Sequence, residues 1–353
     1  MDLDELSELL ALPSLVADLD ALESTMVDVL RRDGTLDELV EPGIRVVTGG
    51  GKRLRPTLTI AAAAVGGAPA NDHVTAAGVA VELVQVGSLV HDDLMDHAKT
   101  RRGVETVNAR EGLNWAILVG DYLLAVAGIQ AASVSKEVAH SLARTIADLA
   151  AGQGREVARQ GDPHRSVADY EASIRGKTAA LMRCSATVGA QAAGMSLMEV
   201  DALAAFGEGF GMAFQIVDDV LDVVASSEKL GKPAGNDIGE GVFTLPVIYA
   251  LDGPEGERLA ELLERRTDDA AVAEANELVR RSDGVRLALD AARDWNGRAA
   301  DLLAGFDSCL LYTSDAADDL PCVDLGGRRS IKKNNSPAPT PHPLLAPHCQ
   351  HRL

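Results

Sequence analysis

The sequence predicts an all-α protein, and three observations carry that prediction. Hydrophobic residues make up 46% of the 353 residues, whereas aromatic residues make up only 3%. A mixture rich in Ala, Leu and Val packs helices closely and gives little of the aromatic and β-branched alternation that strands use. Apolar residues also recur at spacings i, i+3 and i+4 from about residue 2 to 307, with breaks at Gly and Pro.

The helical pattern is clearest near the two ends of this region, over residues 4–30 and 286–306. Between them, four segments rich in Gly and Pro end one helix and allow the next to begin; they cover residues 49–56, 66–72, 161–166 and 230–241. No repeat and no linker divides the region. We therefore predict that residues 1–307 form a single domain.

After Asp307 the composition changes abruptly. Residues 308–353 hold three of the four Cys, three of the eight His and six of the fourteen Pro. This composition predicts a disordered tail. The tail is open to two interpretations, a natural flexible extension or an artefact of the gene model, because part of it resembles translated sequencing-adapter read-through. We assign no function to it.

The formal net charge of −20 excludes several classes of function. Nucleic acid and anionic lipid are held by clustered Lys and Arg, so neither is expected as a partner, whereas acidic groups can recruit cations. The longest apolar stretch, residues 115–129, is interrupted by Asp121, so no transmembrane segment is expected. The acidic N-terminus lacks the basic start of a signal peptide, and we expect a cytoplasmic protein. Cys184 is alone in the main region and is predicted to be a buried core residue.

Two aspartate clusters with the same spacing are the main candidates for chemistry. Residues four apart lie on one face of a helix, so Asp92 and Asp96 project together and Asp93 flanks them. For this cluster alone, a solvated helix end paired with nearby Lys and Arg is an equally good interpretation. The spacing returns in the apolar segment FQIVDDVLDVV, residues 214–224. There, unpaired carboxylates would be costly, and a shared cation site explains both clusters.

Carboxylate ligands favour a hard cation such as Mg²⁺, which keeps several waters and is commonly held by one or two carboxylates together with a substrate phosphate. The predicted substrate is therefore a phosphate ester. A matching basic segment, GGGKRLRP at residues 49–56, supplies Lys52, Arg53 and Arg55 beside three glycines that allow the backbone to approach a phosphate.

Together these motifs resemble the trans-isoprenyl diphosphate synthase, or polyprenyl synthetase, family over roughly residues 40–250. The resemblance rests on GGGKRLRP, the two aspartate clusters, RRG at 101–103, GKT at 176–178 and FQIVDDVLD at 214–222, in this order. It implies an isoprenoid-synthase helical bundle around a deep central cavity. It also implies a prenyltransferase that condenses isopentenyl diphosphate with an allylic diphosphate to make a trans-polyprenyl diphosphate.

The resemblance assigns roles to individual residues. Mg²⁺ would be ligated by Asp92, Asp96 and Asp218, with Asp93, Asp219 and Asp222 in support. Isopentenyl diphosphate would be held by Lys52, Arg55 and Arg102, with Gln85 as a neutral contact where many members carry His. The allylic diphosphate would be met by Arg101, Lys177, Thr178, Gln215 and Lys232. Lys177 would also act in catalysis, and Lys232 would have to suffice where Val242 replaces a Lys that many relatives carry.

The mechanism expected from these residues needs no protein nucleophile. The cation and the basic side chains stabilise the departing diphosphate, the C–O bond ionises, and the isopentenyl double bond attacks the allylic cation. Apolar walls keep water from the cation. The alternatives are a class I terpene cyclase, which would not need the second diphosphate site, and a non-catalytic subunit of a heteromeric synthase, in which the aspartate motifs would be eroded.

Product length and assembly are further expectations. Small residues precede the first cluster, Gly87 and Ser88 one turn away and Val84 and Val81 deeper, so the floor of the cavity is predicted to be open. An open floor favours a medium- or long-chain product, with geranylgeranyl diphosphate as the alternative. The apolar circumference of residues 114–132, together with the resemblance, predicts a homodimer.

Overall fold

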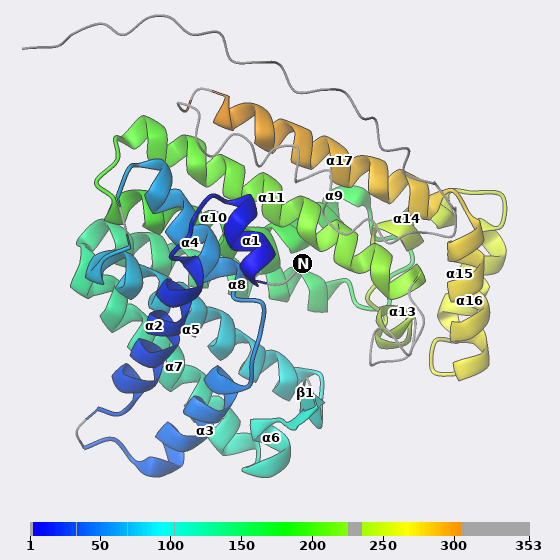
Figure 1. Ribbon diagram of the computed structural model, residues 1–353. Coiled ribbons are helices and arrows are strands. Elements are labelled where there is room, and N and C mark those ends of the chain that lie inside the picture. Colours follow the sequence, from blue (N-terminus) through cyan, green and yellow to red (C-terminus); the bar gives the residue numbers. More distant parts are fainter. Residues whose placement is uncertain are drawn as a thin grey trace, which may run out of the picture.

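The computed structural model describes residues 3–32, 34–68, 70–101, 103–224, 235–304 and 306 (Figure 1). Over these residues the fold is all-α, as predicted, and the strands present form one two-residue hairpin. The elements are α1 (Leu3–Leu9), α2 (Leu15–Leu30), α3 (Asp37–Thr48), α4 (Leu54–Val65), α5 (Asp72–Met95), β1 (Thr100–Arg101), β2 (Val104–Glu105), α6 (Val107–Arg110), α7 (Leu113–Val134), α8 (Lys136–Ala158), α9 (Val167–Ile174), the π-helical turn η1 (Arg175–Ala179), α10 (Ala180–Ala192), α11 (Leu197–Val224), α13 (Asn236–Glu240), α14 (Leu245–Leu251), α15 (Gly256–Glu264), α16 (Asp269–Arg281) and α17 (Gly284–Leu303).

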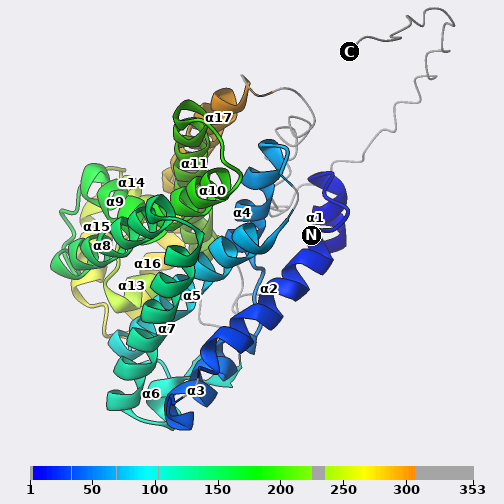
Figure 2. The same ribbon diagram turned by 90° about the vertical axis from the view of Figure 1, so that its left-hand side faces the viewer.

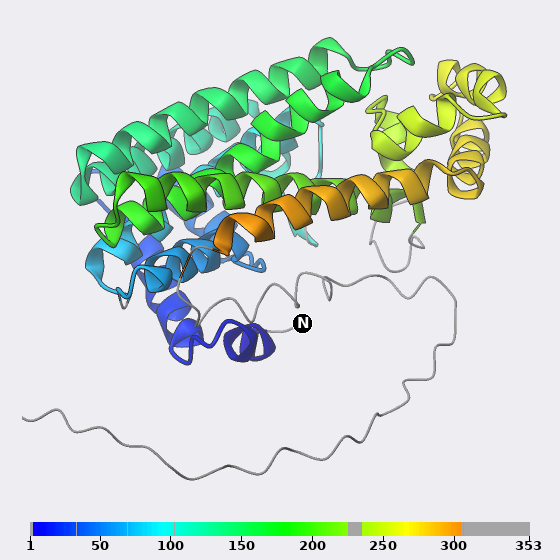
Figure 3. The same ribbon diagram turned by 90° about the horizontal axis from the view of Figure 1, so that it is seen from above.

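Both helical patterns predicted near the ends of the region, residues 4–30 and 286–306, are helical in the structure, with one difference from the prediction. Residues 4–30 form two helices, because Pro13 lacks the amide hydrogen that a continuous helix needs and Ala11 adopts a left-handed conformation with φ of 50°. The predicted helix at 286–306 is α17, which runs beside α11 (Figures 1 and 3). The predicted tail, residues 308–353, lies outside the described residues, and the single-domain boundary stays a prediction.

Helix α5 lies in the middle of the bundle and carries the first aspartate cluster at its C-terminal end. It packs against α2, α4, α7 and α10 (Figures 1 and 2). Its apolar residues on all sides, among them Val81, Leu83 and Val84, are buried in the largest hydrophobic core, which also includes Cys184. A helix that is hydrophobic around its circumference is stable only when it is surrounded in this way.

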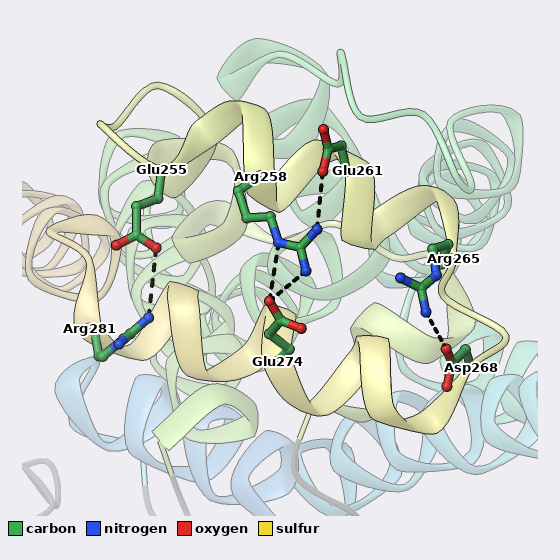
Figure 4. A network of polar contacts seen from close by, with 7 residues as sticks. All are labelled: Glu255, Arg258, Glu261, Arg265, Asp268, Glu274 and Arg281. Carbon is green, nitrogen blue, oxygen red and sulfur yellow. Dashed lines mark hydrogen bonds and ion pairs between the residues drawn. The ribbon is translucent and has the colours of Figure 1, made fainter.

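A second, smaller core lies at the C-terminal end of α11 and joins it to α13, α14, α15 and α16. It gathers Phe243, Val247 and Leu262 with residues of α13 and α16. On the outer face of the hairpin formed by α15 and α16, Arg258 forms ion pairs with Glu261 and Glu274 at 3.1 and 2.8 Å (Figure 4). These side chains are exposed, so each pair contributes little to stability.

Among the described residues, three helices, α5, α7 and α11, are long and apolar enough to cross a membrane by length and composition alone, so the absence of a transmembrane segment stays a prediction. In α5, 67% of the most apolar window is buried inside the protein, whereas in α7 the fraction is 33%. The apolar residues of α5 therefore serve the core. Those of α7 leave an exposed apolar face that includes Leu113, Ile117, Leu118 and Ile129.

Candidate active site

The first aspartate cluster lies at the C-terminal end of α5, where Asp92 and Asp93 belong to the last turn and Asp96 is the C-cap residue. Carboxylates at this end of a helix face the negative pole of the helix dipole, which disfavours their charge. Burial raises the pKa of Asp92, and the nearby Asp96 raises it further, while Lys177 opposes both effects. The cluster is therefore a place where a cation would be stabilised.

Lys177 reaches this cluster because η1 passes very close to α8. A Cβ atom on Gly176 would lie 2.7 Å from the backbone oxygen of Asp148 and 2.7 Å from the Cα atom of Gly152, so only glycines permit the crossing. The crossing places Lys177 Nζ 2.6 Å from Glu156 Oε1. Burial alone would lower the pKa of Lys177, but Glu156, Asp92 and Asp96 outweigh it and raise the pKa, so the side chain stays a cation.

Asp93 is held by Arg101, whose Nε donates to Asp93 Oδ1 at 2.6 Å. The short hairpin β1–β2 after α5 turns the chain back so that Arg101 lies against the helix end. Burial raises the pKa of Asp93, and the Arg101 pair opposes that rise. Arg102, predicted as a diphosphate contact, lies outside the described residues.

In the second cluster the three aspartates of α11 have different surroundings. Asp218 is exposed, whereas Asp219 and Asp222 are buried. Asp219 accepts hydrogen bonds from Tyr170 Oη at 2.6 Å and from Gln215 Nε2 at 2.7 Å. Burial, with a further contribution from Asp237, raises the pKa of Asp219 to about 8.

A short hydrogen-bond chain links the second cluster to the GKT segment. Thr178 Oγ1 donates to Gln215 Oε1 at 2.6 Å, and Gln215 in turn donates to Asp219. Lys177 and Thr178 are neighbours in η1. The charge of Lys177 interacts with Asp92 and Asp96 of the first cluster, and Thr178 is linked to Asp219 of the second cluster through Gln215. The structure thus brings together two motifs that are more than a hundred residues apart in the sequence.

Asp222 contacts the first residues described after the second cluster, at the start of α13. Its Oδ2 accepts from the backbone N–H of Asp237 at 3.3 Å, and its backbone oxygen accepts from Gly235 at 3.1 Å. Asp222 is therefore a supporting residue that brings Asp237 near Asp219. Lys232, a predicted allylic contact, lies outside the described residues.

A cavity of roughly 380 Å³ opens between the GGGKRLRP segment, α5 and the hairpin. Its polar lining includes Lys52, Arg55, Gln85, Asp93 and Arg101, and its apolar lining includes Leu54, Val86, Leu89, Val107 and Phe214. The cavity therefore combines a cationic rim with an apolar wall. This is the arrangement that a phosphate ester of a small hydrocarbon would need.

The donors around the two clusters suit a hard divalent cation. Within the described part of the chain, no three His, Cys, Asp or Glu side chains are close enough to hold a metal ion together. Magnesium does not need such a cage, since it retains waters and uses one or two carboxylates with a substrate phosphate. The oxygen-only side chains of Asp92, Asp96 and Asp218 fit that requirement.

One prediction about the cavity floor is wrong. A Cβ atom on Gly87 would lie 3.2 Å from the backbone oxygen of Gly120 and 3.3 Å from both Leu123 Cβ and Leu124 Cδ2, so this position faces α7 and not open space. Helical spacing places Gly87 near Asp92 along α5 but does not say which neighbouring helix it meets. The sequence also gave no signal for Glu156, Tyr170 and Asp237, which reach the site through long-range contacts.

Comparisons with known proteins bear on the family and the fold of the chain. A family model described as polyprenyl synthetase matches residues 37–279. The chain is 37% identical to a nonaprenyl diphosphate synthase of Mycobacterium tuberculosis, covering 84% of each protein, and 32% identical to a heptaprenyl diphosphate synthase component 2 of Bacillus subtilis, covering 77% of this chain and 78% of the relative. Among solved structures, a polyprenyl synthase from Caulobacter crescentus complexed with calcium and isoprenyl diphosphate has a TM-score of 0.80 and 33% identity, covering 88% of this chain and 96% of that one.

Proposed function

The chain belongs to the polyprenyl synthetase family and is a prenyltransferase, and we propose that it condenses isopentenyl diphosphate with an allylic diphosphate into a medium- or long-chain trans-polyprenyl diphosphate. The observation that carries the proposal is that η1 links the two aspartate clusters, through the charge of Lys177 on one side and the Thr178–Gln215 hydrogen bond on the other, beside a cavity with a cationic rim. The chain length is supported by the nonaprenyl, heptaprenyl and octaprenyl synthases among the relatives. Geranylgeranyl diphosphate remains the alternative product, since synthases of that product share the fold.

We assign the allylic diphosphate to the space between the two clusters. Asp92, Asp96 and Asp218 would hold Mg²⁺, with Asp93, Asp219 and Asp222 in support. The bound Mg²⁺ would supply positive charge to the leaving diphosphate. Lys177, Thr178 and Gln215 would contact this diphosphate, together with Arg101 and Lys232.

We place isopentenyl diphosphate in the cavity. Lys52 and Arg55 would hold its diphosphate at the rim with Arg102, and Gln85 would donate a hydrogen bond. Its hydrocarbon part would lie against Val86, Leu89 and Phe214.

The chain's own side chains then account for the reaction. Positive charge on Lys177 stabilises the departing diphosphate as the C–O bond breaks and an allylic cation forms. The isopentenyl double bond attacks this cation, and a proton leaves to the released diphosphate. The apolar cavity wall, including Leu89 and Phe214, excludes the water that would otherwise quench the cation.

The active protein is proposed to be a homodimer built on α7. Four large apolar side chains of that helix, Leu113, Ile117, Leu118 and Ile129, are 40–58% exposed. Several large apolar side chains exposed on one helix are typical of an interface. The Bacillus relative is named as one component of a synthase, so a heteromeric assembly is the second candidate.

Incubation of the purified full-length chain with isopentenyl diphosphate, an allylic primer and Mg²⁺, followed by chromatography of the dephosphorylated products, tests the proposal. A ladder ending at seven or more isoprene units supports it, and a C20 end product supports the alternative. A cyclic hydrocarbon from the allylic diphosphate alone would instead identify a terpene cyclase. Failure to turn over alone, with activity restored by a second protein, would identify a subunit of a heteromeric synthase.

A further inference from the structure

The three basic residues of GGGKRLRP do not lie in equivalent places. Lys52 is exposed and Arg55 is half-buried at the rim of the cavity, whereas the side chain of Arg53 is only 4% exposed. Its guanidinium donates to Glu23 Oε1 at 2.6 Å, to Glu82 Oε1 at 2.7 Å and to the backbone oxygen of Val47 at 2.6 Å. With its donors engaged in this way, Arg53 is unsuited to binding a diphosphate directly.

The contacts of Arg53 tie together the elements that carry the rim. Val47 lies in the last turn of α3, where backbone oxygens lack helical partners, so Arg53 caps that helix. Arg53 is also the N-cap residue of α4, and Glu23 and Glu82 belong to α2 and α5. The Gly-rich loop between α3 and α4 is thus closed at its base by one side chain.

The backbone of Arg53 indicates that this side chain is needed there. Its φ of 48° and ψ of 34° are left-handed, a conformation that glycine adopts readily and that is strained for other residues. An arginine at such a position persists only where the surroundings hold it. Burial would lower the pKa of Arg53, but Glu82 and Glu23 outweigh it and raise the pKa, so the guanidinium is charged.

Glu82 gives Arg53 a second role besides closing the loop. The Glu82 side chain is 8% exposed and also lines the cavity in which we place isopentenyl diphosphate. A buried carboxylate without its cation would repel an anionic ligand at short range, because charges inside a protein are screened only weakly.

We infer that Arg53 is a positioning residue for the isopentenyl diphosphate site: it sets the loop that presents Lys52 and Arg55, and it neutralises Glu82 beside the bound diphosphate. The inference rests on the proposed placement of that substrate in the cavity. It assigns different tasks to neighbouring residues that are chemically alike. Lys52 and Arg55 contact the ligand, whereas Arg53 acts through them and through Glu82.

Initial rates of the first condensation, with each diphosphate varied in turn, test the inference on Arg53→Met, Glu82→Gln and the double variant. Arg53→Met is expected to raise KM for isopentenyl diphosphate roughly ten- to a hundredfold, the effect of losing one charge-assisted interaction. KM for the allylic diphosphate and kcat should change less than about threefold. Glu82→Gln in the Arg53→Met background should recover at least half of the loss on a logarithmic scale, because it removes the uncompensated charge.

Three further variants make the result decisive. Arg183→Met removes a half-buried arginine paired with Asp148 at 2.7 Å, outside the cavity, and should leave KM for isopentenyl diphosphate unchanged. If Arg53→Met does not fold, Arg53→Lys, which retains the charge but not three contacts, should show a smaller rise in the same KM. Lys52→Ala tests whether isopentenyl diphosphate binds in the cavity, because Lys52 is proposed to contact its diphosphate directly.

The outcomes separate the two claims. If Lys52→Ala raises KM for isopentenyl diphosphate and the Arg53 variants do not, the role of Arg53 is overturned and the substrate placement stands. If neither raises it, both are overturned. Equal rises in the two KM values, or no recovery in the double variant, would show that Arg53 serves the fold alone.

Discussion

Tyr170→Phe is the most informative single change in the second aspartate cluster. The Tyr170 hydroxyl is buried and donates to Asp219 Oδ2 at 2.6 Å, and the ring is part of the core between α9 and α11. Phenylalanine fills the same volume, so the substitution removes one hydrogen bond and little else. Asp219 keeps its second donor, Gln215.

The magnitude follows from the charge state of Asp219. Burial raises the pKa of this carboxyl to about 8, while the hydrogen bonds from Tyr170 and Gln215 restrain that rise. A hydrogen bond to a charged group contributes about 1.5–3 kcal/mol, equivalent to roughly one to two pH units. Loss of the Tyr170 donor should therefore move the pKa of Asp219 upward by that amount.

The sign of the effect on activity is fixed, because the ionised carboxylate is the form that supports a cation. At pH 7 a higher pKa leaves less of the ionised form, so kcat/KM should fall roughly ten- to a hundredfold. Toward pH 9.5 the deficit should shrink. In a plot of kcat/KM against pH, the rise on the acidic side is therefore expected at higher pH for Tyr170→Phe. The plateau value at high pH should be near that of the unchanged protein.

The assay is incorporation of labelled isopentenyl diphosphate at subsaturating substrate from pH 6 to 9.5, with Mg²⁺ in constant excess. Tyr122→Phe is the matched control, since the Tyr122 hydroxyl donates to the backbone oxygen of Leu30 at 2.7 Å, away from the carboxylates. Tyr122→Phe should lose some thermal stability, but the acidic side of its kcat/KM profile should lie at the same pH as in the unchanged protein. An equal loss at every pH in Tyr170→Phe would refute the reasoning.

Three other predictions concern the clusters, the floor and the assembly. Asp92→Ala or Asp218→Ala should lower kcat by orders of magnitude with the helical circular dichroism signal unchanged; near-normal turnover would reject the cation assignment. Gly87→Phe should lower the free energy of unfolding by more than about 3 kcal/mol, measured by denaturant titration, because the ring would displace the backbone of α7; a stable variant with shorter products would restore the open-floor interpretation. Ile117→Asp should convert a dimer into a monomer in sedimentation at micromolar concentration, and a wild-type chain that already sediments as a monomer would contradict the homodimer.

Much of the fold could be predicted because its signals are local. Apolar spacing and Gly or Pro breaks define the helices, and the four-residue spacing of Asp92 and Asp96 predicts that they project from one face; the structure places both at the end of α5. The same reasoning identified a second cluster at Asp218, Asp219 and Asp222. It did not separate the exposed Asp218 from its two buried neighbours, because that difference depends on which helices pack against each side of α11.

The parts that could not be predicted depend on contacts between distant segments. Tyr170 reaches Asp219 across 49 positions, and no spacing rule connects them. Arg53 has the same chemistry as Arg55 in the sequence, and only its left-handed backbone and its contacts with Glu23 and Glu82 distinguish the two roles. Periodicity describes one helix at a time, whereas these roles arise between helices.

The two proposed diphosphate sites differ in how their basic side chains are paired with carboxylates of the protein. Near the aspartate clusters, Lys177 is paired with Glu156 and Arg101 with Asp93, so an incoming diphosphate competes with the protein's own carboxylates. At the cavity, the buried carboxylate of Glu82 is paired with Arg53, the Asp93–Arg101 pair also lines the wall, and Lys52 is exposed. In a chain with a net charge of −20, we therefore expect anion binding at the proposed allylic site to depend more strongly on added divalent cation than anion binding at Lys52 and Arg55. This asymmetry fits the chemistry, because the diphosphate at the first site is the one that must leave.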